Sequence, residues 1–102
     1  MNTVVSLPTL DELRRYVHAA LCERDSLDPA QSPLRESLIL SGGQPCGLLL
    51  EVRGPRLTRN SAIWAGQENR ILFYDTSGAR VGEVRLCEAP DPAGLLRSRD
   101  AA

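Results

Sequence analysis

Residues 38–86 of the chain read LILSGGQPCGLLLEVRGPRLTRNSAIWAGQENRILFYDTSGARVGEVRL. Short apolar runs in this segment are separated by turns rich in Gly, Pro, Asn and Asp, and no helical period occurs in it. The runs are Leu38–Leu40, Leu48–Val52, Ala62–Ala65, Ile71–Tyr74 and Val81–Leu86. Runs of this length between turn residues are typical of strands, and short connections favour antiparallel neighbours. The segment therefore predicts a five-stranded antiparallel β-meander.

One helix is predicted ahead of the meander. Thr9 and Glu12 have the spacing of a capping box, in which the Thr9 hydroxyl accepts from the Glu12 amide. Behind this cap, apolar residues recur at helical spacing at Leu10, Leu13, Val17, Ala20 and Leu21. We expect the helix to run from Leu10 to Arg24, followed by a proline-bearing linker over residues 25–33.

The predicted fold class is α+β, with one N-terminal helix packed on a five-stranded antiparallel β-meander. This arrangement resembles the cystatin-like or wrapped-sheet type of small domain, and a likeness of architecture implies no function. A chain of 102 residues predicts one domain. We place that domain at residues 1–90 and a flexible C-terminal tail at residues 91–102, in which Leu95 and Leu96 are able to form one docking turn.

Charge and cysteine usage bound the cellular setting. The net charge is −1, so no overall field draws the protein to nucleic acid or to an acidic membrane. The three cysteines Cys22, Cys46 and Cys87 fit neither a metal knuckle nor a disulfide framework. The N-terminus lacks a signal peptide, and no apolar run reaches the ~18 residues that span a bilayer. We expect a cytoplasmic protein with free thiols and no membrane association.

The run Ile71–Tyr74 is apolar or aromatic at every position, as expected for a central strand that is covered on both faces. A single helix covers only one of these faces. The other face curls on itself, is covered by the linker and tail, or meets another molecule. Strand alternation assigns Leu49, Ile63 and either Leu72 or Phe73 to this second face. Because an uncovered apolar patch of this size favours association, we expect Leu49, Ile63 and Leu72 to form the interface of a homodimer.

Four arginines gather around the second and third turns of the meander: Arg53, Arg56, Arg59 and Arg70. Three aromatic residues follow nearby in the sequence, namely Trp64, Phe73 and Tyr74. Arginines interleaved with aromatic residues are able to bind single-stranded nucleic acid or another anion. The aromatic residues lie in the most apolar strands, however, where packing in the core explains them. Nucleic-acid binding is therefore the second hypothesis.

A small enzyme is the third hypothesis. His18 and Cys22 share one helix face, where they could act as a base beside a thiolate or as two metal ligands. The chain has no other histidine to complete a site. Cys46 lies in the Gly42–Gly47 loop, which precedes a strand rather than a helix and so predicts a hairpin rather than a phosphate cradle. No catalytic motif, metal or cofactor is predicted, and the leading hypothesis is a non-enzymatic protein-interaction module.

Overall fold

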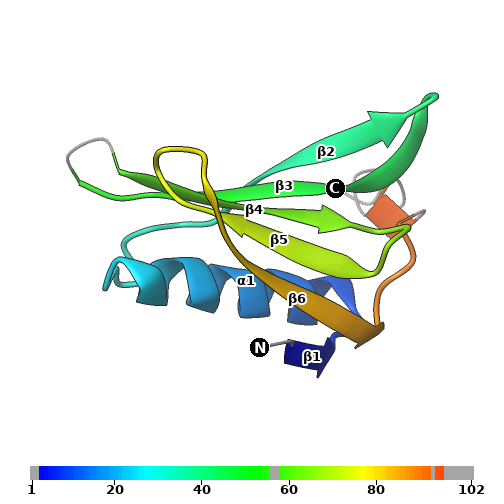
Figure 1. Cartoon of the computed structure of the whole chain (residues 1–102), viewed down its shortest axis with the longest axis horizontal. Coiled ribbons are helices and arrows are strands. Elements are labelled where there is room, and N and C mark those ends of the chain that lie inside the picture. The colour runs from blue at the N-terminus through cyan, green and yellow to red at the C-terminus, as the bar shows by residue number, and fades with distance from the viewer. Residues whose placement is uncertain (1–2, 56–57, 93, 96–102) are drawn as a thin grey trace.

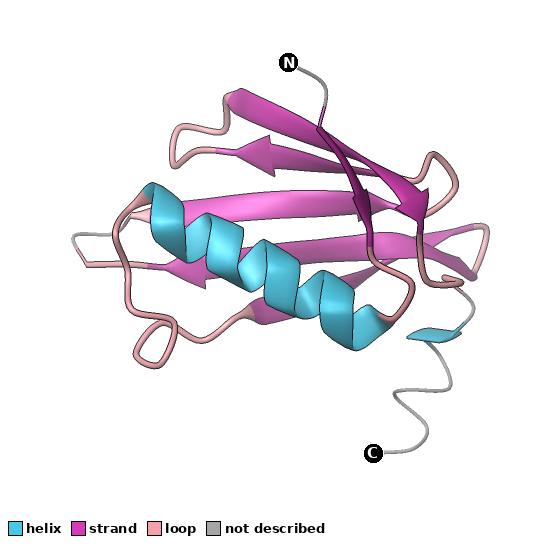
Figure 2. Ribbon diagram, turned by 90° about the horizontal axis from the view of Figure 1, so that it is seen from below, coloured by secondary structure: helices cyan, strands magenta, loops and turns pink. Residues whose placement is uncertain are grey.

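The computed structural model describes residues 3–55, 58–92 and 94–95. One helix lies across one face of a six-stranded sheet (Figure 1, Figure 2). The elements are β1 (Thr3–Ser6), α1 (Leu10–Arg24), β2 (Arg35–Ser41), β3 (Gln44–Arg53), β4 (Arg59–Ala65), β5 (Arg70–Tyr74) and β6 (Arg80–Glu88). The strand order is β1-β6-β5-β4-β3-β2. The α+β class and the meander are confirmed.

The predicted strand count is wrong by one, because β1 was missed. This strand runs parallel to β6, with Val4 opposite Arg85 and Val5 opposite Leu86. It has four residues, and its only partner lies at the far end of the sequence. A local apolar pattern cannot reveal such a pairing, since the partner strand fixes it. The consecutive strands β2 to β6 are antiparallel, as predicted.

The first hairpin is longer than the sequence pattern predicts. Gly42 and Gly43, with φ angles of 60° and 81°, form a two-residue turn between β2 and β3. Both strands therefore continue up to this turn. Pro45, which cannot donate to a neighbouring strand, lies where the register shifts between Ile39 and Leu40. This irregularity allows β3 to begin before its apolar run.

The helix is confirmed at the predicted residues. It runs from Leu10 to Arg24, and the Glu12 amide donates to Thr9 Oγ1 at 3.2 Å. The buried helix residues are Leu13, Val17, Leu21 and Cys22. The apolar residues that recur at helical spacing thus form the helix face that packs on the sheet.

The core lies between α1 and the sheet, and Trp64 is its largest fully buried side chain. From the sheet, the buried core residues are Leu48, Leu50, Val52, Ala62, Trp64, Ile71, Phe73, Val84 and Leu86. We expected Trp64 to be buried, with its indole donating to a carbonyl or to water at the sheet margin. The burial is confirmed, but Trp64 Nε1 has no partner among the described residues.

The segments that follow the helix and the last strand both cover the helix side of the sheet. Leu27 and Leu34, which flank the linker, pack against the core, and Leu95 is part of it. The docking turn expected at Leu95 therefore packs on the core, while Leu96 lies outside the described residues.

Replacing Thr9 by Ala should lower the free energy of unfolding by ~1 kcal/mol, because the Glu12 amide loses its acceptor. Urea denaturation at neutral pH measures the change. Thr9→Ser keeps the hydroxyl and serves as the control, with most of the stability retained. Equal losses in the two variants would contradict this account of the cap.

Candidate functional site

The sheet face turned away from α1 carries the apolar residues predicted for an interface. In the register of the sheet, Leu49 lies opposite Ile63 and Ile63 lies opposite Leu72. The three side chains are half-buried and form one row across β3, β4 and β5. We call Leu49, Ile63 and Leu72 the apolar row, and the sheet face that bears it the open face. Phe73 is buried on the other face, which resolves the choice between Leu72 and Phe73.

Polar residues close both ends of the apolar row. Ser37 on β2 lies opposite Leu49, and Glu83 on β6 lies opposite Leu72. Among the described residues, the only helix longer than one turn is α1, which lies on the other side of the sheet (Figure 2). The linker and the turn at Leu95 pack on that side as well. No described element therefore covers the apolar row.

A shallow hollow of about 240 Å³ opens beside the row, with Ile39, Gly47, Ile63, Ala65 and Glu68 among its lining residues. A Cβ atom at Gly47 would overlap the carbonyl oxygen of Trp64, so this position accepts only glycine at the observed strand spacing. The missing side chain leaves the hollow between β2 and β4.

The predicted arginine cluster does not form one surface. Arg53 lies opposite Arg59 at one end of β3 and β4, whereas Arg70 lies opposite Ala65 at the other end of β4. At the rise of a β-strand, the six steps from Arg59 to Ala65 separate these ends by roughly 20 Å. Arg56 lies outside the described residues. Arginines that are close in the sequence thus lie far apart, because β4 runs between them.

The two ends also differ in how tightly glutamates hold the arginines. Arg70 contacts Glu83 at 2.6 Å and Glu68 at 2.8 Å. The hydrogen bond from Arg70 lowers the pKa of Glu83 below its usual value, and the same bond raises the pKa of Arg70. At the other end, Arg53 and Arg59 share Glu51 at 3.5 and 3.8 Å. The guanidinium of Arg70 is occupied, while those of Arg53 and Arg59 are only loosely paired.

Of the three aromatic residues, only Tyr74 lies on the same face as one of these arginines, diagonally from Arg59. Trp64 and Phe73 are buried under α1, and Phe73 packs beneath Arg24, whose guanidinium carbon lies 5.7 Å from the ring centroid. Tyr74 is half-buried and alternates with Phe73, so it belongs to the open face. A platform on which successive bases stack needs several exposed rings. The described surface therefore lacks the geometry of that hypothesis.

His18 and Cys22 meet at a backbone carbonyl rather than at a reactive site. His18 Nε2 lies 2.7 Å from the Ser32 oxygen, so this nitrogen is the donor, and Cys22 Sγ lies 3.9 Å from the same oxygen. His18 and Cys22 share one helix face, as predicted, but the linker covers that face and Cys22 is 1% exposed. Burial, followed by the charge of Asp28, raises the pKa of Cys22. A raised pKa and a buried sulfur make Cys22 a poor nucleophile.

The other two cysteines each contact a backbone carbonyl. Cys46 Sγ lies 3.4 Å from the Ile39 oxygen, and Cys87 Sγ lies 3.4 Å from the Val5 oxygen. Within residues 3–55, 58–92 and 94–95, no three His, Cys, Asp or Glu side chains gather closely enough to hold a metal ion.

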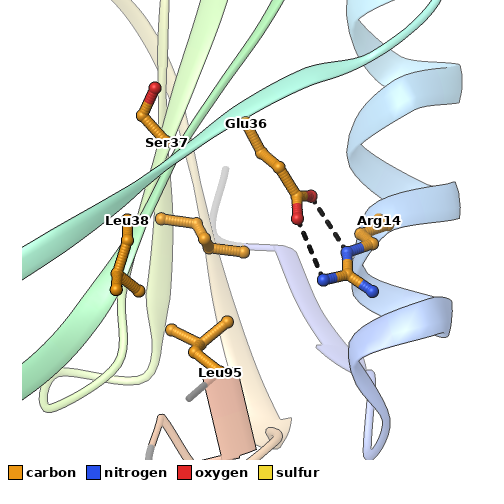
Figure 3. A pocket seen from close by; sticks show the side chains of 6 residues that line it. Arg14, Glu36, Ser37, Leu38 and Leu95 are labelled. Carbon is orange, nitrogen blue, oxygen red and sulfur yellow. Dashed lines mark hydrogen bonds and ion pairs between the residues drawn. The ribbon is translucent and has the colours of Figure 1, made fainter. Parts of the chain in front are cut away.

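Sequence reasoning missed a cleft of about 350 Å³ between α1 and the edge strand β2. Arg14 binds both carboxylate oxygens of Glu36 at 2.9 Å, and Leu38, Leu48 and Leu95 line the remaining wall (Figure 3). These residues come from three distant parts of the chain, so no local pattern predicts them. The ion pair joins the helix to the sheet edge and occupies the polar groups of the cleft.

Comparison of the chain with models of protein families gives no match, and comparisons with curated proteins and with solved structures give none either. Within the described part of the chain, no helix has the length and apolar character that crossing a bilayer requires.

The three thiols should differ sharply in reactivity. Cys87 is exposed, Cys46 is half-buried and Cys22 is buried with a raised pKa. We expect an aromatic disulfide reagent at neutral pH to modify Cys87 first and Cys22 only upon unfolding, because little thiolate forms at Cys22. Mass spectrometry of the labelled peptides assigns each site. Modification of native Cys22 as fast as Cys87 would contradict its structural role and favour the enzyme hypothesis.

Proposed function

We propose that this protein is a non-enzymatic protein-interaction module that forms a homodimer through its open face. The observation that carries the proposal is the direct pairing of Leu49, Ile63 and Leu72 across three strands that no described element covers. The three side chains are half-buried by their neighbours on the sheet, and contiguous apolar surface of this kind marks interaction sites in proteins. The structural use of His18 and Cys22 weighs against the enzyme hypothesis.

A second copy is the occupant that fits the row best, because the row is symmetric about its centre. Ile63 lies between two leucines, one on each neighbouring strand. A two-fold axis that runs along β4 at Ile63 would stack Leu49 of one copy on Leu72 of the other and place the Ile63 side chains against each other. Such a self-complementary patch is what a two-fold interface requires.

The polar groups around the row suit the same arrangement. On the open face, Glu51 lies two residues beyond Leu49 on β3, and Tyr74 lies two residues beyond Leu72 on β5. Both flank Ser61 of β4. The axis along β4 would bring the Tyr74 hydroxyl of one copy toward the Glu51 carboxylate of the other. At the outer strands, Ser37 would face Glu83. Each carboxylate would thus meet a hydroxyl donor. Arg59 lies on the same face of β4, so the axis would bring the two copies of Arg59 near each other at the end of the strand, where each contacts Glu51 of its own chain.

The size of the open face sets how strongly two copies are expected to bind each other. Strands spaced by about 4.8 Å make the paired region about 20 Å wide, so two such faces bury on the order of 1,000 Å². This area lies at the lower limit for a specific interface. We therefore expect dissociation in the micromolar range, with the monomer populated on dilution.

The same proposal places the protein in the cytoplasm. Cys22, Cys46 and Cys87 are free thiols, and a reducing compartment keeps them so.

Light scattering over a dilution series should show a reversible change from dimer to monomer. Ile63→Arg should abolish the dimer, because two guanidinium groups would meet at the axis. Ile63→Glu should do the same. A mixture of the two variants should form a heterodimer, because opposite charges then meet.

Leu40→Arg is the matched control, because Leu40 is 54% exposed at the end of the first hairpin and lies outside the row. This variant should dimerise like the original chain. A chain that stays monomeric at high micromolar concentration would refute the proposal. Dimers that persist in Ile63→Arg would place the interface elsewhere.

A further inference from the structure

A second surface lies at the end of the sheet where β3 ends and β4 begins. A cleft of about 400 Å³ there is lined by Arg53, Gly54, Thr58, Arg59 and Thr76. The flanks of the β3–β4 connection and the β5–β6 turn meet at this end (Figure 1). Among the described residues, the lining contains two guanidinium groups and two hydroxyls, and it contains no carboxylate.

The guanidinium groups have donors to spare. Arg53 Nη2 lies 3.5 Å and Arg59 Nε lies 3.8 Å from the one carboxylate of Glu51. The pair between Arg14 and Glu36, by contrast, closes at 2.9 Å. Charge-assisted hydrogen bonds are about 2.7–2.9 Å long, so neither contact with Glu51 is a full bond. Two cations that share one anion leave one positive charge at the cleft.

One hydroxyl is also able to donate into the cleft. Thr76 Oγ1 accepts from the Arg59 amide at 3.0 Å, which leaves its own proton available. The Thr58 hydroxyl is committed to the Pro55 oxygen at 2.8 Å. The Asp75 carboxylate, adjacent in sequence, accepts from Ser77 and Ala79 within its own turn. These bonds, the one from the Ser77 hydroxyl first, lower the pKa of Asp75 and hold its charge in the turn.

We propose that this cleft binds a tetrahedral oxyanion of the phosphate class, held by Arg53, Arg59 and the Thr76 hydroxyl. Each guanidinium presents a planar fork of donors that matches two oxygens of a phosphate. Inorganic phosphate and the phosphate of a small organic ester share this chemistry. The site uses residues outside the apolar row, but Arg53 and Arg59 share the open face with it and both contact Glu51, so phosphate binding is tested on the monomer populated at low concentration.

The test is a titration of the full chain, labelled with ¹⁵N, with inorganic phosphate and separately with a nucleoside monophosphate. Saturable shifts are expected at the amides of Gly54, Arg59 and Thr76. The double variant Arg53→Gln, Arg59→Gln should weaken binding at least about tenfold, as expected for the loss of hydrogen bonds to a charged group. Arg85→Gln, which removes an exposed arginine from β6, is the matched control and should change affinity less than about twofold.

Tighter binding of the nucleotide would identify an organic phosphate, and equal affinity would identify phosphate itself; both support the site. If the double variant loses its folded spectrum, the shift map of the original chain decides. Linear shifts without saturation, or shifts at Arg70 and Arg85, would overturn the proposal. Equal weakening by Arg85→Gln would also overturn it. Salt-sensitive, submicromolar binding of a single-stranded oligonucleotide, lost equally in both variants, would favour nucleic-acid binding instead.

Discussion

The structure depends on the packing of one helix against one face of a sheet that is wider than the helix. Six strands at about 4.8 Å spacing span about 24 Å, whereas a helix with its side chains is about 10 Å across. Helix α1 covers the middle of that face, where Leu13, Val17 and Leu21 share the core with Trp64. The linker and the turn at Leu95 seal the margins of this core, and no described element lies on the far side of the sheet.

The margins are sealed by the linker and by the turn at Leu95, both on the helix side. The Ser32 carbonyl accepts a hydrogen bond from His18, and Leu27 and Leu34 pack on the core. Leu95 lies in the same cleft as Leu48 of β3. The linker and the turn at Leu95 therefore pack on the helix side and do not cover the open face. The described core therefore does not explain the apolar character of Leu49, Ile63 and Leu72, and the proposed association through this face would account for it.

The parts of the fold that could be predicted from the sequence are those fixed by local chemistry. The Thr9 cap and the helical spacing behind it located α1 at both ends. Alternation along β3 and β4 assigned Leu49 and Ile63 to the correct face, whereas the choice between Leu72 and Phe73 on β5 was left open. Strand β1 was missed because its only partner, β6, is remote in the sequence.

The candidate sites were predicted less well, because they depend on register and on loop placement. Arg59 and Arg70 are close in sequence, yet they lie at opposite ends of the sheet because β4 runs between them. Cys22 is buried because the linker packs over its helix face, and a helical pattern alone does not show where the linker lies. The cleft beside Arg53 needs Thr76, which comes from the β5–β6 turn and carries no signal of its own in the sequence.

The most direct test of the account is an isotope-filtered NMR measurement on an equimolar mixture of ¹³C-labelled and unlabelled chains. The account predicts intermolecular contacts between the methyl groups of Leu49 and Leu72, and between the two copies of Ile63. Within one chain, β4 separates Leu49 from Leu72. Intermolecular contacts confined to the edge strand β2, or none at concentrations above the expected dissociation constant, would contradict the claim that the open face is the interface.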